Sequence, residues 1–117
     1  MAGRIKRRLT AQFLAHARSV EERVVICPLC DRDIPDSEQE SHHLVPKSKG
    51  GKDTLVIHRI CNRQIHALFT ESELARVYNT VDALRAHPEF AGFVRWVAGK
   101  PADFFERAAK SERIRKR

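Results

Sequence analysis

The sequence predicts a small α+β domain in which short strands and a cluster of metal-binding side chains are followed by helices. Short β-branched runs bounded by turn residues, such as Leu55–Ile57 after Gly50-Gly51, indicate strands. From Cys61 onward, apolar residues recur at helical spacing. With 117 residues, the chain has room for one domain with a modest core.

The first half of the chain contains one expected helix and three expected strands. Residues 9–23 place apolar side chains at helical spacing, and residues 24–26 predict a strand leading into the first cysteine pair. A second strand is expected over residues 42–45, where Pro46 ends it. Residues 49–52 then predict a turn before a third strand at residues 55–57.

The second half predicts helices with recognisable starting residues. A helix is expected from Cys61 to Phe69, and the sequence Thr-Glu-Ser-Glu at residues 70–73 is a capping box that opens the next one. Thr80 is placed to cap a third helix, and Pro88 suits the first turn of a fourth. One apolar face of that fourth helix is expected to pack in the core: Phe90, Phe93, Val94 and Val97. Residues 101–117 are expected to be weakly helical.

Positive charge is concentrated at the two ends of the chain. Of the net charge of +7, residues 1–8 contribute +4 and residues 110–117 contribute +4, so the body between them is nearly neutral. Within that body, residues 47–63 are locally basic. Basic arms commonly follow a polyanion, and nucleic acid is the first candidate, although solubilising tails would look the same. No apolar run is long enough to span a membrane.

Three cysteines and a histidine have the spacing of a structural zinc site. Cys27 and Cys30 form one knuckle with two intervening residues, and His58 and Cys61 repeat that spacing. Three cysteines cannot all pair within one chain, and no export signal precedes them, which favours metal over a disulfide. A redox-active cysteine pair is the rival interpretation, but the βαβ pattern that usually surrounds one is missing here.

A second group of ligands remains after these four are assigned. Asn62 and His66 are four residues apart, so a helix places both on one face. His42 and His43 lie on an expected strand that could run beside that face. One of the two histidines, with Asn62 and His66, would hold an ion with open coordination positions, as a catalytic metal requires. The other histidine would be free to act as a base, since an ordinary imidazole titrates near pH 6.5.

Taken together, these residues resemble the HNH endonuclease family. The resemblance runs from Cys27 to about Phe69 and rests on CPLC, on HHLVPKSKGG and on HRICNRQIH. The family implies the ββα-metal fold, a structural zinc, and hydrolysis of phosphodiester bonds in nucleic acid. The helical stretch from Thr70 to Ala98 also resembles an extension found in small bacterial members.

The resemblance implies a role for each matching position. His43 matches the general base, while His42 and His66 match ligands of the catalytic divalent ion. Asn62 stands where many members carry a histidine or asparagine ligand. Asp53 occupies a position where many members have an asparagine that positions the loop bearing the base. The ion is expected to be Mg²⁺, with Mn²⁺ and Ni²⁺ as alternatives.

His58 departs from the family pattern, because many members open the second knuckle with a cysteine. A stripe of His58, Asn62 and His66 on one helix face would alternatively place His58 at the catalytic ion. Zinc would then lack a fourth protein ligand, so we expect His58 at the zinc.

The expected organisation is a basic arm (1–8), an HNH core with its N-terminal helix (9–69), and a helical extension ending in a basic tail (70–117). We expect a cytoplasmic endonuclease acting on nucleic acid, with double-stranded DNA as the first candidate and no membrane partner. The side chains expected to contact phosphates are Lys47, Lys49, Lys52 and Arg63. The main alternative is a zinc-stabilised nucleic-acid-binding module without catalysis, and a weaker one is a protein–protein adaptor built on the C-terminal helices.

Overall fold

The computed structural model describes residues 24–108 and Ile114. Over these residues the fold is α+β, as expected, with one two-stranded sheet and four helices. The strands are β1 (Gln39–His43) and β2 (Thr54–His58), and the helices are α2 (Arg59–Leu68), α3 (Glu71–Arg76), α4 (Val81–Ala86) and α5 (Pro88–Val97). Short 3₁₀ turns occupy Asp36–Glu38 and Lys47–Lys49. The helix expected at residues 9–23 and the basic arm 1–8 lie outside the described residues, as does most of the basic tail.

Strands β1 and β2 form an antiparallel hairpin in which His42 is opposite Leu55 and His43 is opposite Thr54. The loop between them depends on its two glycines. Gly50 has a φ of 86°, which favours glycine, and a Cβ atom on Gly51 would overlap the carbonyl group of Val45. The hairpin places β1 beside α2, where His42 contacts Asn62.

Two strand expectations need correction. β1 spans residues 39–43 instead of 42–45, because the partner strand ends at His58 and this register pairs Gln39 with it. Residues 24–26 form only a single bridge, between Ile26 and Asp33, because the chain folds back at once through the cysteine knuckle. Polar side chains at Gln39 and Glu40 concealed the start of β1 from a pattern search for apolar alternation.

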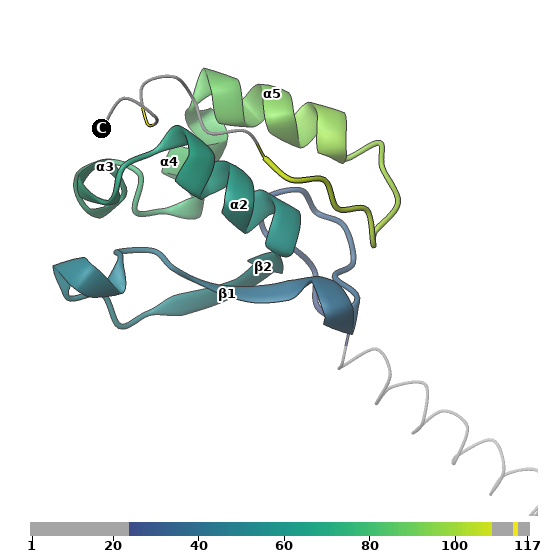
Figure 1. Cartoon of the computed structure of the whole chain (residues 1–117), viewed down its shortest axis with the longest axis horizontal. Coiled ribbons are helices and arrows are strands. Elements are labelled where there is room, and N and C mark those ends of the chain that lie inside the picture. The colour runs from purple at the N-terminus through teal and green to yellow at the C-terminus, as the bar shows by residue number, and fades with distance from the viewer. Residues whose placement is uncertain (1–23, 109–113, 115–117) are drawn as a thin grey trace, which may run out of the picture.

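Helix α2 lies between the hairpin on one side and α5 on the other, as Figure 1 shows. Its buried side chains Ile60, Cys61 and Ile65 reach the core, which continues through Ile57 of β2. Of the extension, α5 packs on α2 and α4 packs on α5, whereas α3 contacts the 3₁₀ turn Lys47–Lys49 in the hairpin loop (Figure 1). The core is thus built around α2, the helix that carries Asn62 and His66.

The C-terminal helices begin as the sequence predicts. Both halves of the capping box between Thr70 and Glu73 are present, and the Thr80 hydroxyl accepts a hydrogen bond from the amide of Ala83. Pro88 starts α5, whose expected apolar face packs inward, with Phe90 and Val97 fully buried. The capped starts fix where each short helix begins, which is needed because these helices are too short to be stable alone.

After α5 the chain turns back toward α2 without forming a helix at residues 101–108 (Figure 1). The carbonyl groups of Lys100, Pro101 and Ala102 accept hydrogen bonds from the side chains of Arg32 and His58, and the amide of Phe104 closes a single turn on the carbonyl of Pro101. This non-helical segment differs from the weak helix expected at residues 101–117. No helix within the described residues is long and apolar enough to cross a membrane.

Candidate metal centres

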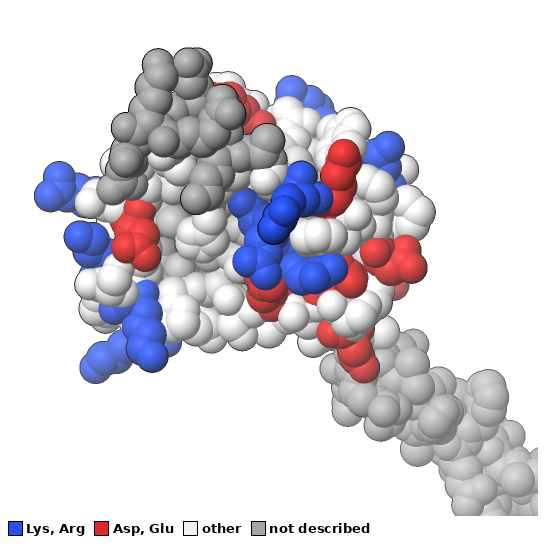
Figure 2. Space-filling model, in the orientation of Figure 1, with Lys and Arg blue, Asp and Glu red and all other residues white. Residues whose placement is uncertain are grey.

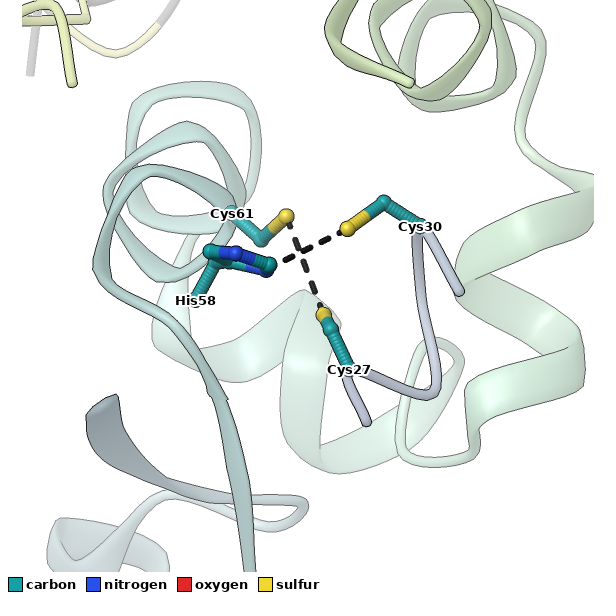
Figure 3. A group of neighbouring side chains, drawn as sticks. All are labelled: Cys27, Cys30, His58 and Cys61. Carbon is teal, nitrogen blue, oxygen red and sulfur yellow. Dashed lines mark hydrogen bonds between the residues drawn. The ribbon is translucent and has the colours of Figure 1, made fainter. Parts of the chain in front are cut away.

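The two knuckles meet, and their four side chains form one buried cluster. The ligand atoms of Cys27, Cys30, His58 and Cys61 all lie within 4.8 Å of one another. The Sγ atoms of Cys27 and Cys61 are 4.0 Å apart, and the Sγ atom of Cys30 is 3.3 Å from Nδ1 of His58 (Figure 3). Ligand atoms around a tetrahedral zinc are about 3.5–3.8 Å apart, so the cluster needs only small shifts to hold zinc.

The knuckle that carries Cys27 and Cys30 is shaped by backbone hydrogen bonds. The amide of Asp31 donates to the carbonyl of Cys27, and the amide of Cys27 donates to the carbonyl of Arg32. Asp31 adopts a φ of 61°, which aspartate tolerates better than most residues. This tight turn points both thiols the same way, toward α2.

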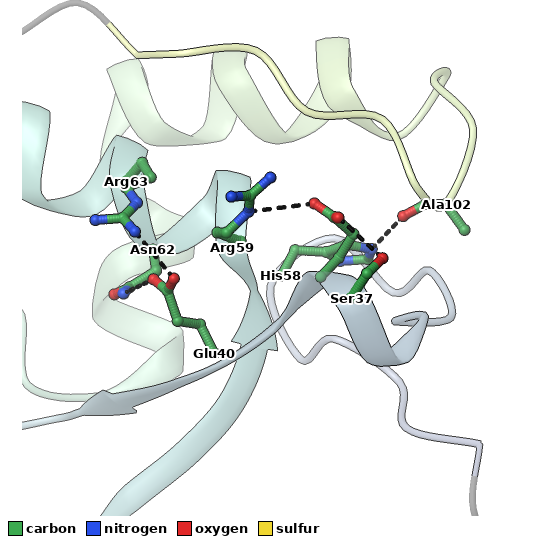
Figure 4. Close-up of polar contacts among 8 residues, drawn as sticks. Ser37, Glu40, His58, Arg59, Asn62, Arg63 and Ala102 are labelled. Atoms are coloured by element: carbon green, nitrogen blue, oxygen red, sulfur yellow. Dashed lines mark hydrogen bonds and ion pairs between the residues drawn. The ribbon is translucent and has the colours of Figure 1, made fainter.

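The imidazole of His58 is oriented by a hydrogen bond on its far side. Its Nε2 lies 2.9 Å from the carbonyl oxygen of Ala102, which can only accept, so Nε2 carries the proton (Figure 4). The lone pair is therefore on Nδ1, the nitrogen that faces Cys30. Metal-binding histidines usually have such a partner on the other nitrogen. This arrangement fits zinc and places His58 with the cysteines, away from the second group of ligands.

Arg32 supports the same cluster from outside. Its Nε donates to the Sγ of Cys30 at 3.3 Å, and its NH1 donates to the carbonyls of Lys100 and Pro101. Arg32 and His58 together therefore tie the segment after α5 to the cysteine cluster, across more than 40 residues of sequence.

Three buried thiols in contact cannot all ionise without a cation nearby. Contact with Cys27, then contact with Cys30 and burial, raises the pKa of the Cys61 thiol, and contact with Cys30 raises that of Cys27. The pKa of Cys30 is lowered by its contacts with the other two thiols and with Arg32. A bound cation such as zinc would remove this conflict, because thiolates are its preferred ligands.

A second cluster joins the hairpin to α2. His42 is buried, and its Nδ1 lies 3.1 Å from Oδ1 of Asn62. The rings of His42 and His66 meet edge to face with their centroids 5.7 Å apart. The predicted grouping of His42, Asn62 and His66 is thus what the fold brings about, with Asn62 and His66 on one face of α2.

Glu40 determines how Asn62 is oriented. The amide nitrogen of Asn62 donates to Oε1 of Glu40 at 2.6 Å, and Arg63 donates to Oε2 at 3.1 Å (Figure 4). Since the nitrogen of Asn62 faces the carboxylate, its oxygen faces His42 and accepts the proton of Nδ1. The lone pair of His42 is therefore on Nε2, and Nε2 is buried with no hydrogen-bond partner in the described part of the chain.

Burial also sets the charge of this cluster. Burial, followed by the neighbouring charge of His66, lowers the pKa of His42 to about 4, although the contact with Asn62 opposes the shift. Partial burial of its ring likewise lowers the pKa of His66, against the opposing charge of Glu71. Both imidazoles are then neutral at pH 7, the form in which they bind metal ions. A buried, unpartnered lone pair beside a second neutral imidazole fits a divalent cation.

His43 and Asp53 are less constrained. His43 follows His42 on β1 and is half-buried, and its imidazole has no hydrogen-bond partner among residues 24–108. Asp53 is exposed just before β2, and its backbone carbonyl accepts from the amide of Leu44 at 3.3 Å. The backbone of Asp53 thus holds the chain directly after the two histidines, whereas its carboxylate makes no hydrogen bond or ion pair with either of them.

Comparison with known proteins identifies the family. Residues 27–68 match the family model described as HNH endonuclease. The chain belongs to the HNH endonuclease family. Over 94 residues it is 39% identical to "Uncharacterized protein YisB" of Bacillus subtilis (strain 168), a match that covers 79% of this chain and 92% of that protein. No solved structure matches the chain. The predicted membership is confirmed, and β1, β2 and α2 are the ββα unit of the HNH fold.

On the face shown in Figure 2, one group of basic side chains lies over α2 and another at the closed end of the hairpin, and further basic side chains are scattered around the margin. Lys47, Lys49 and Lys52 belong to the hairpin end, where all three are exposed. Arg63 is exposed on α2 and is paired with Glu40. The four expected phosphate contacts are therefore all accessible, but they do not form one continuous patch.

Sequence reasoning missed Glu40, Arg32 and Ala102. Glu40 had a usable signal, because it lies two residues before His42 and therefore on the same face of a strand. Arg32 and Ala102 had none, because their contacts depend on how the segment after α5 folds back over the cysteine cluster.

Proposed function

We propose that the protein is a metal-dependent endonuclease that hydrolyses phosphodiester bonds in nucleic acid, with double-stranded DNA as the expected substrate. The observation that carries this proposal is the buried Nε2 lone pair of His42, which lies beside His66 and has no hydrogen-bond partner among the described residues. Buried nitrogens are usually hydrogen-bonded, and Nδ1 of His87 is another buried nitrogen without a partner among the described residues, so the argument depends on the position of His42 Nε2 beside His66. An unsatisfied nitrogen next to a second neutral imidazole is instead suited to a cation.

The ligands in this proposal are His42, Asn62 and His66. Imidazole nitrogen and amide oxygen accept several divalent ions, so Mg²⁺, Mn²⁺ and Ni²⁺ are all candidates. When bound, the ion would supply positive charge to the phosphate and to the departing 3′-oxygen. In the observed geometry Asn62 Oδ1 accepts from Nδ1 of His42, on the opposite side of the ring from Nε2, so Asn62 orients His42 and would have to turn toward Nε2 to coordinate the same ion.

His43 is proposed as the general base that removes a proton from the attacking water. Its imidazole is half-buried at the end of β1 and has no hydrogen-bond partner in the described region, so a nitrogen is available to accept that proton. Adjacent strand residues point to opposite sides of the strand, so His43 and His42 are expected to have different roles, one as the base and the other as a metal ligand. The bond from Leu44 to Asp53 fixes the backbone just beyond His43.

The four-residue cluster is proposed to hold a structural zinc through Cys27, Cys30, His58 and Cys61. It lies in the core beneath α2, so it fixes the start of the helix that carries Asn62 and His66. Lys47, Lys49, Lys52 and Arg63 are proposed to contact phosphates without reading bases.

The test is incubation of a supercoiled plasmid with the zinc-loaded protein and a panel of divalent ions. Wild type should cleave only when a divalent ion is added, leaving 5′-phosphate ends, and the His43→Ala variant should be slower by about 10²–10⁴-fold. DNA binding without cleavage under any ion would instead favour the non-catalytic binding module.

A further inference from the structure

A groove of about 530 Å³ opens between α2 and the segment that follows α5. It is lined by Arg59, Arg63, His66 and Ala67 of α2 and by Phe105, Arg107 and Ala108 of the returning segment. We call it the arginine groove. Three of its seven lining residues are arginines and none is acidic, so it is suited to an anionic ligand.

Two of the arginines are held in place before any ligand arrives. The guanidinium of Arg59 lies over the ring of Phe105, 3.7 Å from its centroid, and its Nε is 3.5 Å from Glu38. Arg63 uses one terminal nitrogen for Glu40. A guanidinium has five N–H donors, so each keeps donors for a further anion while losing little freedom on binding it.

Arg107 completes the groove from the other side. It is exposed, and no acidic partner for it lies within residues 24–108. Its place in the wall depends on the cysteine cluster, because His58 and Arg32 bind the carbonyls of residues 100–102 just before it. The cluster proposed to hold zinc therefore also positions one wall of the groove.

The groove begins at the candidate divalent-ion site. His66 lines the groove, and its ring also contacts the ring of His42. A strand whose scissile phosphate lies at His42 and His66 would thus carry its neighbouring phosphates past Arg63 toward Arg59 and Arg107.

We propose that the arginine groove binds the backbone phosphates of the substrate strand on one side of the scissile bond. This inference rests on the proposed nuclease function and adds Arg59, Phe105 and Arg107 to the substrate-binding surface. Phe105 contributes by holding Arg59 in its stacked position, not by contact with the reacting atoms.

The test measures binding of a short labelled DNA duplex in a His43→Ala background, where the bound strand is not cleaved. Arg107→Ala should weaken binding by about 3- to 10-fold. The corresponding loss of binding free energy lies between the contribution of an exposed ion pair and that of a hydrogen bond to a charged group. The slope of the logarithm of the binding constant against the logarithm of the salt concentration should become shallower by about 0.9, which is the change expected when one phosphate contact is lost. Arg107→Lys should restore most of that slope. Phe105→Ala should weaken binding in the same direction.

The matched control is Arg95→Ala, which removes another exposed arginine, on α5, that does not line the groove. Unchanged zinc content and melting temperature would show that each variant is folded. If Arg107→Ala and Arg95→Ala bind the duplex with the same affinity and the same salt slope, the groove proposal is wrong. Cleavage by the wild-type protein in the same experiments would still support the nuclease function. Wild-type protein that neither binds nor cleaves the duplex would overturn both proposals.

Discussion

Removing the carboxylate of Glu40 should weaken divalent-ion binding, although the substitution changes none of the proposed ligands themselves. Glu40 accepts the amide proton of Asn62 at 2.6 Å, and this contact directs the Asn62 oxygen toward His42. In Glu40→Ala the Asn62 amide can rotate, so His42 is no longer held as the tautomer with its lone pair on Nε2. Glu40→Gln should have a smaller effect, because a neutral amide oxygen can still accept the bond.

The size of the effect follows from the contact. A hydrogen bond to a charged group contributes about 1.5–3 kcal/mol, and the Glu40 side chain is only 26% exposed. Loss of a group that orients a metal ligand typically lowers metal affinity by about 10- to 100-fold, which is the same range. We therefore expect Mn²⁺ to bind Glu40→Ala about 10- to 100-fold more weakly, with cleavage recovering at saturating Mn²⁺.

The assay is calorimetric titration of zinc-loaded protein with Mn²⁺. Arg63→Met is one control, since it removes the other partner of Glu40 and leaves the contact with Asn62 in place. Glu89→Ala is a second control, because Glu89 is an exposed carboxylate on α5. Equal affinity in wild type, Glu40→Ala and Glu89→Ala would refute the claim that Glu40 orients the ligands through Asn62.

Three other properties follow from the same structure. Cys61→Ala should lose about one zinc per chain by metal analysis and should unfold at lower temperature, because zinc sites of this kind contribute directly to folding; an unchanged melting temperature in zinc-free protein would contradict this. Since burial lowers the pKa of His42 to about 4 and also lowers that of His66, Mn²⁺ affinity should fall by less than about 10-fold from pH 7.5 to 5.5. Two imidazoles with ordinary pKa values would lose about 100-fold over that interval. Deleting residues 1–8 or 110–117 should raise KM more than it lowers kcat and should reduce the salt dependence of cleavage; unchanged binding would make the arms solubilising tails.

The candidate zinc ligands were predictable because the spacing of the four residues along the chain indicates their chemistry. The two knuckles at Cys27 and His58 repeat the same interval, and few other functions need three cysteines and a histidine in that pattern. The helix starts at Thr70, Thr80 and Pro88 were likewise predictable, because capping depends on neighbours within one turn.

The contacts that orient the ligands were not predictable, because they join segments far apart in the sequence. Glu40 meets Asn62 only once β1 is paired in the observed register, and polar residues at the start of β1 obscured that register. His58 finds its partner at Ala102 because the chain after α5 returns across the cluster, and no local pattern indicates that return. The arginine groove depends on the same return, which brings Phe105 onto Arg59.

The most direct test of the central claim is a single-turnover cleavage rate measured against Mn²⁺ concentration for wild type, His42→Ala, His43→Ala and His66→Ala. The proposed roles predict two kinds of defect. His43→Ala should cleave about 10²–10⁴-fold more slowly at every Mn²⁺ concentration while binding Mn²⁺ normally. His42→Ala and His66→Ala should need much more Mn²⁺ and should recover in part when it is supplied. Wild-type rates in His43→Ala would show that the base is misassigned, and wild-type rates in all three variants would contradict the nuclease site itself.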